Sequence, residues 1–233
     1  MYPYPKDIIA VVIAKTMGEN RIPLFKRTLE FFGFIGFMKL MNELLMLKIK
    51  DWGRIDSFHS LIRLLKKNNI NIIRTKDVNS PRMILELTRL KPTLSLSVAF
   101  PQIFKEEVLK VPSRGAINIH HSLLPEYRGM LPTFWQLYHG KKNLGITAHQ
   151  INEKIDDGKI IVQESHATIE NESFHKTVQR TKRLGAYTLL GAIDLILDSN
   201  FKPNVNNKKA GSYYTFPNYL ELKEFRKKGF RLI

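Results

Sequence analysis

Two kinds of hydrophobic pattern alternate along the chain, and their order predicts the fold class. Residues 7–15 form a nearly continuous β-branched run, which is typical of a strand buried in a parallel sheet. Further strand patterns follow at 70–78, 94–100, 116–120, 145–151 and 159–167. Helix patterns lie between or after them at 57–68, 80–90, 104–111, 131–140 and about 173–198.

Strands that alternate with helices at this pitch indicate βαβ units. We therefore predict an α/β fold, with a Rossmann-like, mostly parallel sheet flanked by helices and a short C-terminal extension. Residues 1–200 are assigned to one domain, expected to be the catalytic one, and residues 201–233 to a linker and a short aromatic and basic tail. Ligands of such folds bind beyond the carboxyl ends of the strands, so functional residues are expected there.

One long apolar stretch, residues 24–49, stands outside this alternation. Its longest uncharged run, Phe31 to Met38, is far shorter than the roughly 20 residues that a membrane span needs, so we predict no transmembrane segment. We expect a buried or partner-facing helix, with docking on a membrane surface as the alternative. The charges that interrupt the stretch recur at spacings compatible with one helical face: Glu30, Lys39, Glu43 and Lys48.

The amino-acid composition indicates the class of protein and the cellular compartment in which it is expected. The 233 residues are 43% hydrophobic and 25% charged, as in an ordinary globular domain. The absence of cysteine excludes disulfides and thiolate chemistry, and it fits a reducing cytosol. The N-terminal residues do not read as a secretory signal, so a cytoplasmic location is expected.

The formal net charge of +16 predicts attraction to anions such as nucleic acid, acidic membrane or phosphorylated metabolites. The same charge is also compatible with a solvated basic surface, because the basic residues are spread along the chain. They are densest in residues 201–233, which hold eight Lys or Arg against two Glu.

The polar residues of INIHHSLLPEYRG (117–129) interrupt a strand pattern at its end. Residues two apart in a strand share a face, so Asn118 and His120 point the same way and His121 diverges from them. An amide donor beside an imidazole suits a carbonyl oxygen that gains negative charge. A carboxylate from EKIDDGK (153–159) could orient the imidazole or accept a proton.

Spacing alone leaves a plainer interpretation open. Asn118 would cap a turn, His120 would be a satisfied histidine at a strand end, and residues 156–157 would form a turn. Other chemistries lack their motifs, since no P-loop, GxGxxG, HExxH, CxxC or GxSxG occurs. Adjacent His120 and His121 cannot easily share a metal ion, and we predict no metal site.

NIHHSLLPEYRG, GITAH and IDDG, in this order, resemble the folate-dependent formyltransferase family. Its members carry Asn-x-His-x-Ser-Leu-Leu-Pro, then a Gly-x-Thr/Ser-x-His strand, then Leu-Asp-x-Gly. The resemblance covers about residues 92–165. It implies an enzyme of one-carbon metabolism that transfers a formyl group from 10-formyltetrahydrofolate to a primary amine.

The resemblance implies which residues act. Asn118, His120 and Asp156 match the family's catalytic triad, and Asp156 rather than Asp157 takes the motif position because Gly158 lies two residues later. Asn118 and His120 are then expected to stabilise the oxyanion, while Asp156 assists proton transfer. Contacts with the folate are implied for Phe100, Gln102, Ile103, Phe104, Thr147, His149, Ile151, Asn152 and Ile155.

Tyr127 and Arg128 are implied to bind the acceptor. Arg128 would meet a phosphate, or it would brace the loop by pairing with a carboxylate. The YRG-x-x-P-x-x-W segment, 127–135, resembles that of enzymes that formylate amino sugars carried on nucleotides. A nucleotide-linked amino sugar is therefore the acceptor that we prefer. The aromatic residues of the tail are expected to pack on the domain or on a second subunit, which leaves a homodimer open.

Three other members of the family remain as alternatives. Formyltetrahydrofolate deformylase, a hydrolase, shares the doubled histidine, but the strand at 7–15 leaves no room for its usual regulatory domain. The initiator methionyl-tRNA enzyme carries a C-terminal β-barrel that residues 201–233 cannot form, although the net charge would suit tRNA. The glycinamide-ribotide enzyme has a Gly-rich phosphate loop after its first strand, which this sequence lacks.

Overall fold

The computed structural model describes residues 7–14, 21–51, 61–207 and 211–233. The predicted strand at 7–15 and helix at 57–68 are present as β1 and α2, apart from residues 15 and 57–60, which lie outside the described residues. The elements in chain order are β1 (Ala10–Ala14), α1 (Arg21–Asp51), α2 (Leu61–Lys67), β2 (Asn71–Thr75), α3 (Pro81–Leu90), β3 (Ser95–Ser97), α4 (Glu106–Leu109), β4 (Ala116–His120), β5 (Arg128–Gly129), α5 (Pro132–Tyr138), β6 (Asn143–Gln150), β7 (Ile160–Ala167), α6 (Phe174–Leu197), β8 (Tyr213–Tyr214) and α7 (Tyr219–Lys227).

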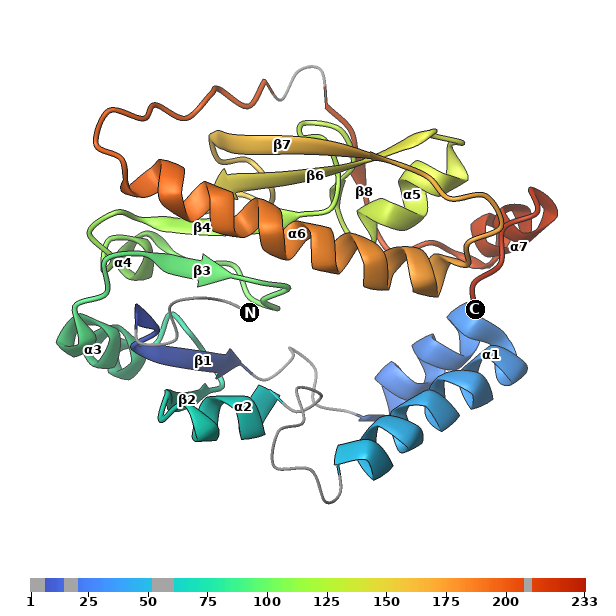
Figure 1. The fold of residues 1–233 in the computed structure, drawn as a ribbon, viewed down its shortest axis with the longest axis horizontal. Coiled ribbons are helices and arrows are strands. Elements are labelled where there is room, and N and C mark those ends of the chain that lie inside the picture. Colours follow the sequence, from blue (N-terminus) through green and yellow to red (C-terminus); the bar gives the residue numbers. More distant parts are fainter. Residues whose placement is uncertain (1–6, 15–20, 52–60, 208–210) are drawn as a thin grey trace.

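The strands form a four-stranded sheet in the order β3-β4-β6-β7 and two pairs, β1-β2 and β5-β8. Figure 1 shows the β1-β2 pair beyond the β3 edge of the larger sheet. The predicted α/β class is confirmed, but the four-stranded sheet is mixed rather than mostly parallel, while both two-stranded pairs are parallel. β6 runs antiparallel to both β4 and β7. The connection from β6 to β7, residues 151–159, is too short for the crossover that a parallel pair requires.

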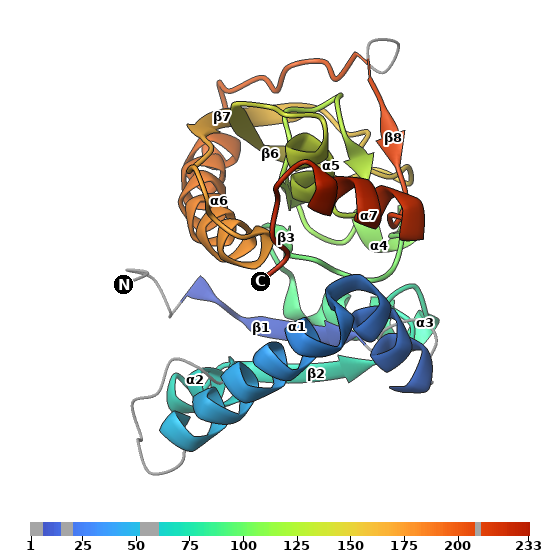
Figure 2. The same ribbon diagram turned by 90° about the vertical axis from the view of Figure 1, so that its right-hand side faces the viewer.

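Helix α6 covers one face of the four-stranded sheet (Figures 1 and 2). It begins at Ser173, whose side chain accepts a hydrogen bond from the backbone N–H of Lys176. Between α6 and the sheet lies a hydrophobic core. Alternate strand residues contribute Ile117, Ile119, Ile146 and Ala148, and α6 contributes Leu189, Ala192 and Ile196. Because strand residues alternate between faces, the polar residues of β4 point away from α6.

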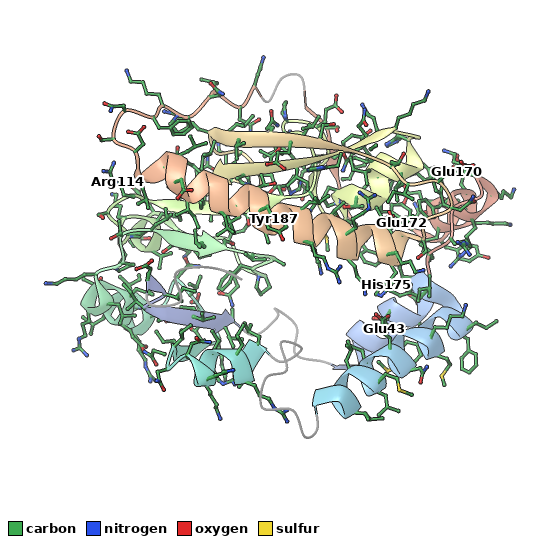
Figure 3. All side chains as sticks on the ribbon, in the orientation of Figure 1. Glu43, Arg114, Glu170, Glu172, His175 and Tyr187 are labelled. Carbon is green, nitrogen blue, oxygen red and sulfur yellow. The ribbon has the colours of Figure 1, made fainter. Side chains whose placement is uncertain are left out.

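The apolar stretch at 24–49 forms α1, a helix interrupted at Gly33, which has φ 72° and ψ 171°. Phe31 is buried, and Glu43 reaches α6, where its Oε2 lies 2.9 Å from Nε2 of His175 (Figure 3). The other face of α1 remains exposed, with the large side chains Phe34, Ile35, Met38, Met41, Leu44, Leu45, Met46 and Ile49. None of the helices in the described part of the chain is long and apolar enough to cross a membrane.

The C-terminal segment packs on the rest of the chain. α7 begins at a capping box formed by Asn218 and Glu221, and it buries Phe225 completely against Phe134, with ring centroids 4.5 Å apart. Tyr214 of β8 stacks on Trp135 at 4.7 Å. The expectation that tail aromatics pack on the domain is confirmed for Tyr214.

Candidate active site

Strands β4 and β6 place four polar side chains on one face of the sheet. In their antiparallel register Asn118 lies opposite His149, and His120 lies opposite Thr147. Directly opposed residues of antiparallel strands project to the same side. The hydrophobic partners of β4, Ile117 and Ile119, face α6 instead. The alternation predicted from the sequence therefore puts Asn118 and His120 together, as expected.

His120 is held between a carbonyl and a carboxylate. Its Nε2 lies 2.9 Å from the backbone oxygen of Tyr127. A carbonyl oxygen only accepts hydrogen bonds, so this nitrogen carries a hydrogen. Its Nδ1 faces Oδ1 of Asp156 at 3.4 Å, and both side chains are almost completely buried. The sequence-predicted pairing of Asp156 with His120 is thus the geometry found.

Asp156 adopts a backbone conformation that few residues other than glycine occupy, with φ 49°. Its Oδ2 accepts a hydrogen bond of 2.8 Å from the backbone N–H of Gly129. Its Oδ1 lies between the two histidines, 3.7 Å from Nε2 of His149. A Cβ at Gly158 would stand 1.7 Å from the carbonyl oxygen of Gln150, so only glycine fits there. This close approach is the physical reason for a glycine two residues after the carboxylate.

His149 is a neutral acceptor at neutral pH. Its Nδ1 lies 2.7 Å from the carbonyl oxygen of Gln150, which places the hydrogen on Nδ1. The bare Nε2 then accepts a hydrogen bond of 3.2 Å from Nδ2 of Asn118. Burial lowers the pKa of His149 to about 4, and the nearby carboxylate of Asp156 opposes that shift. The folate contact that the resemblance implies for His149 stays a prediction, and in this structure its ring orients the amide of Asn118.

The hydroxyl of Thr147 also forms hydrogen bonds within the protein. Its hydroxyl donates to the carbonyl oxygen of Ser122 at 2.6 Å and accepts from the N–H of Leu124 at 3.1 Å. Nε2 of Gln163 lies 2.9 Å from the same hydroxyl and also donates to the carbonyl oxygen of Leu124. Thr147 and Gln163 together fix the turn that follows β4. Gln163 was not singled out by any sequence pattern, because its partners lie far from it in the chain.

The loop after β3 was expected to contact the folate. Phe100 and Phe104 stack with centroids 4.9 Å apart and pack on a small hydrophobic cluster beneath the loop. Gln102 is buried, and its amide accepts from Val78 N–H at 2.8 Å and donates to the Lys76 carbonyl at 2.7 Å. Ile103, in contrast, is 54% exposed, so it is the member of this group that offers apolar surface to a ligand.

The loop between β6 and β7 was also expected to contact the folate, and it likewise combines residues held within the protein with an exposed isoleucine. The N–H of Ile151 donates to the carbonyl oxygen of Ala116 at 2.8 Å, which ties the loop to the start of β4. Nδ2 of Asn152 donates to Oδ2 of Asp157 at 3.1 Å. Ile155 is 44% exposed and offers a second apolar surface.

The ring of Tyr127, which the resemblance implies to bind the acceptor, is buried. Its side chain is 6% exposed and stacks on Tyr214, and burial raises its pKa to about 12. Its backbone carbonyl, not its hydroxyl, serves the site through His120. Arg128 is half-buried, and its Nε finds no acceptor among the residues that the structure describes. No carboxylate of the described residues pairs with that buried nitrogen.

His121 diverges from the cluster, as the sequence predicted. Its ring faces α6, where a Cβ added at Gly185 would lie 2.9 Å from it. Burial, followed by the charges of His120 and Lys182, lowers the pKa of His121 to about 4.

The fold and this cluster define an α/β chain with a buried polar centre of one amide, two imidazoles and one carboxylate at the carboxyl end of a strand. Residues 48–193, more than half of the chain, match the formyl transferase family. The chain therefore belongs to the formyl transferase family, and the resemblance seen in its sequence is confirmed.

Similar proteins differ in length from this chain. The bifunctional polymyxin resistance protein ArnA of Wigglesworthia glossinidia brevipalpis is 34% identical over 140 residues, which cover 60% of this chain and 21% of that protein. The methionyl-tRNA formyltransferase of Geobacter sulfurreducens is 35% identical over 134 residues, covering 58% and 42%. The chain thus spans less than half the length of these two relatives.

Solved structures share the fold. The formyltransferase PseJ from Anoxybacillus kamchatkensis, in complex with UDP-4,6-dideoxy-4-formamido-L-AltNAc and tetrahydrofolate, superposes with a TM-score of 0.54. The two chains are 24% identical, and the match covers 67% of this chain and 80% of that one. A sugar N-formyltransferase from a Shewanella species superposes with a TM-score of 0.55 at 22% identity, covering 76% and 72%.

Proposed function

We propose that this chain transfers a formyl group from 10-formyltetrahydrofolate to a primary amine. The observation that carries the proposal is the buried contact of His120 with Asp156 beside the amide of Asn118, in a chain of the formyl transferase family. The two loops expected to meet the folate each present an exposed isoleucine, Ile103 and Ile155, which suits the flat ring of a pterin.

In the proposed reaction the amine nitrogen attacks the formyl carbon, and the carbonyl electron pair moves onto oxygen. Asn118 donates a hydrogen bond to that oxyanion, with its amide turned by neutral His149. His120, protonated at both nitrogens, places a positive charge nearby while Tyr127 and Asp156 fix its ring. The carboxylate of Asp156 takes up the proton that the amine loses. The carbonyl then re-forms as the bond from carbon to the folate nitrogen breaks, and that nitrogen receives the proton that Asp156 took up.

The acceptor that we propose is an amino sugar carried on a nucleotide. Two observations support it: the unpaired Nε of half-buried Arg128, which suits a phosphate, and the likeness in fold to sugar formyltransferases. A second acceptor, methionyl-tRNA, is favoured by the sequence relatives and by the net charge of +16.

The test is release of tetrahydrofolate, followed by absorbance, with a panel of acceptors and a control without any amine. Turnover with nucleotide-linked amino sugars alone supports the first acceptor, and turnover with initiator methionyl-tRNA alone supports the second. Turnover without an amine would identify a hydrolase and contradict the proposal. Arg128→Ala is expected to raise KM for a phosphorylated acceptor, with Arg114→Ala, an exposed residue labelled in Figure 3, as the matched control.

A further inference from the structure

Residues of the C-terminal segment lie against both loops that build the site. Asn204 exchanges backbone hydrogen bonds of 2.8 Å with Ile160 at the start of β7. Further along, Ser212 accepts from the N–H of Tyr127 through its hydroxyl at 2.8 Å and from the N–H of Arg128 through its carbonyl at 3.0 Å. The described parts of the segment therefore contact both the loop after β4 and the loop that carries the catalytic carboxylate.

Asn206 makes the contact nearest to that carboxylate. It is 7% exposed, and its Nδ2 donates to the carbonyl oxygens of Asp156 at 3.1 Å and Gly158 at 3.2 Å. Only the NH₂ end of the amide can face two carbonyl oxygens, so the orientation of Asn206 is fixed by its partners. One side chain thus holds the carbonyl oxygens of the two residues on either side of Asp157.

This span matters because of the backbone conformation at Asp156. With φ 49°, the residue occupies a region that costs free energy for a side chain other than glycine and persists only when its surroundings hold it. The carbonyl that Asn206 holds belongs to the same residue as the carboxylate. A rotation of the peptide group that follows Asp156 would therefore carry Oδ1 of Asp156 away from Nδ1 of His120. These two atoms are already 3.4 Å apart.

The second oxygen of the carboxylate, Oδ2, is held by a strand that pairs with the same segment. Oδ2 of Asp156 accepts from Gly129 N–H, and Gly129 belongs to β5, which pairs with β8. The carbonyl oxygen of Tyr214 in β8 accepts from Met130 N–H at 2.9 Å. A Cβ at Gly129 would stand 2.2 Å from that carbonyl oxygen, which shows how closely the two strands approach.

We propose that Asn206 is a positioning residue for the reaction and that the C-terminal segment is part of the site. Asn206 holds the backbone of Asp156 so that its carboxylate stays in reach of His120. The inference rests on the proposed formyl transfer, because it assigns Asn206 a role through the residue that moves the proton.

The test compares Asn206→Ala with Asn204→Ala, a matched control whose side chain is exposed two residues away. Turnover is measured with the amine that supports it, and kcat and KM are determined for both substrates. Asn206→Ala is expected to lower kcat by about 10- to 10²-fold, the size of effect that a misplaced catalytic group causes, with both KM values unchanged. Asn204→Ala removes only an exposed side chain and keeps the backbone hydrogen bonds of residue 204 with Ile160, so it is expected to match the wild type.

A second variant separates positioning from folding. Asn206→Ser keeps one hydroxyl donor and is expected to have a kcat between those of Asn206→Ala and the wild type, after correction for the folded fraction. Wild-type kcat in folded Asn206→Ala, or a fall in kcat that only follows the folded fraction, would overturn the inference while leaving the formyl transfer in place. Failure of the proposed function would show differently, as absence of turnover by the wild type with every amine.

Discussion

At the scale of single residues, some members of the site could be predicted from the sequence, and the roles of others could not. Asn118 and His120 follow from strand alternation, and Asp156 follows from the family motif. The roles of their neighbours did not follow, since the ring of Tyr127 is buried and only its carbonyl contacts His120. Whether a residue acts through its side chain or its backbone depends on packing, which local patterns do not encode. The folate contacts and the acceptor contact of Arg128 stay predictions.

His149 gives the first prediction at this scale. His149→Ala removes the acceptor that turns the amide of Asn118, so kcat is expected to fall toward the ~10²-fold loss that follows removal of an oxyanion donor. Steady-state kinetics with saturating folate measures the effect. His166→Ala, on a less buried histidine of β7, is the control and should leave kcat unchanged. Wild-type kcat in the His149→Ala protein would contradict the proposed role.

The two buried histidines also predict how stability depends on pH. His121 and His149 have pKa values of about 4 in the folded protein, below the ordinary value of 6.5 that they regain on unfolding. The unfolded chain therefore binds more protons between these values, and the free energy of unfolding falls as the pH drops from 6.5 toward 4. Above 6.5 the contribution of these rings is fully present.

Urea unfolding at pH 7.5 and pH 5 measures this dependence. Each ring contributes on the order of 3 kcal/mol over the whole window. His121→Gln removes one titrating group. The free energy of unfolding of this variant is therefore expected to fall less steeply than that of the wild type as the pH drops from 7.5 to 5. Equal slopes for the two proteins would show that the ring of His121 is not held neutral in the fold.

At the scale of elements, local patterns predicted most of what the structure contains. The strand expected at 116–120 is β4, and those expected at 145–151 and 159–167 are β6 and β7 with small shifts at their ends. The two-residue strands β5 and β8 were not predicted, because their pairing depends on residues distant in sequence. The break at Gly33 within α1 was also missed, since the apolar pattern continues through it.

The loop from β6 to β7 gives the prediction at this scale. In Gly158→Ala the new methyl group would collide with the carbonyl of Gln150, and no flexible side chain lies there to yield. The loop must shift, so both kcat and the melting temperature are expected to fall. Gly191→Ala in α6 is the control, because a Cβ there meets open space.

Alanine in the interior of a helix is favoured over glycine by roughly 0.5–1 kcal/mol, so Gly191→Ala should raise the melting temperature slightly. Thermal unfolding of both variants beside the wild type measures the difference. An unchanged melting temperature and kcat in Gly158→Ala would show that the loop is not tightly packed against β6.

At the scale of the whole molecule, the C-terminal segment makes contacts that its sequence did not indicate. The sequence predicted a linker and a short tail whose aromatic residues pack on the domain or on a second subunit. In the structure, Asn206, Ser212 and Tyr214 also contact the loops of the site, and α7 contributes to an aromatic core. Hydrogen bonds to loop backbones leave no periodic signature, so the polar composition of this segment could not reveal them.

Phe225 tests whether the tail folds with the body of the protein. Phe225→Ala removes a fully buried ring and is expected to cost roughly 3–5 kcal/mol of unfolding free energy, with a single cooperative transition. Leu220→Ala, on the exposed side of the same helix, should stay within about 0.5 kcal/mol of the wild type. Denaturant unfolding gives both values. A tail that unfolds separately would leave the main transition of Phe225→Ala unchanged.

We propose that the carboxylate of Asp156, held against His120, serves formyl transfer. The most direct measurement compares kcat of Asp156→Asn with that of Asp157→Asn, both corrected for the folded fraction and followed by release of tetrahydrofolate with an amine acceptor. Loss of a group that moves a proton costs ~10²- to 10⁴-fold, and this loss is predicted for Asp156→Asn alone, with Asp157→Asn retaining most of its turnover. Wild-type turnover in Asp156→Asn, or a larger loss in Asp157→Asn, would contradict this role of Asp156.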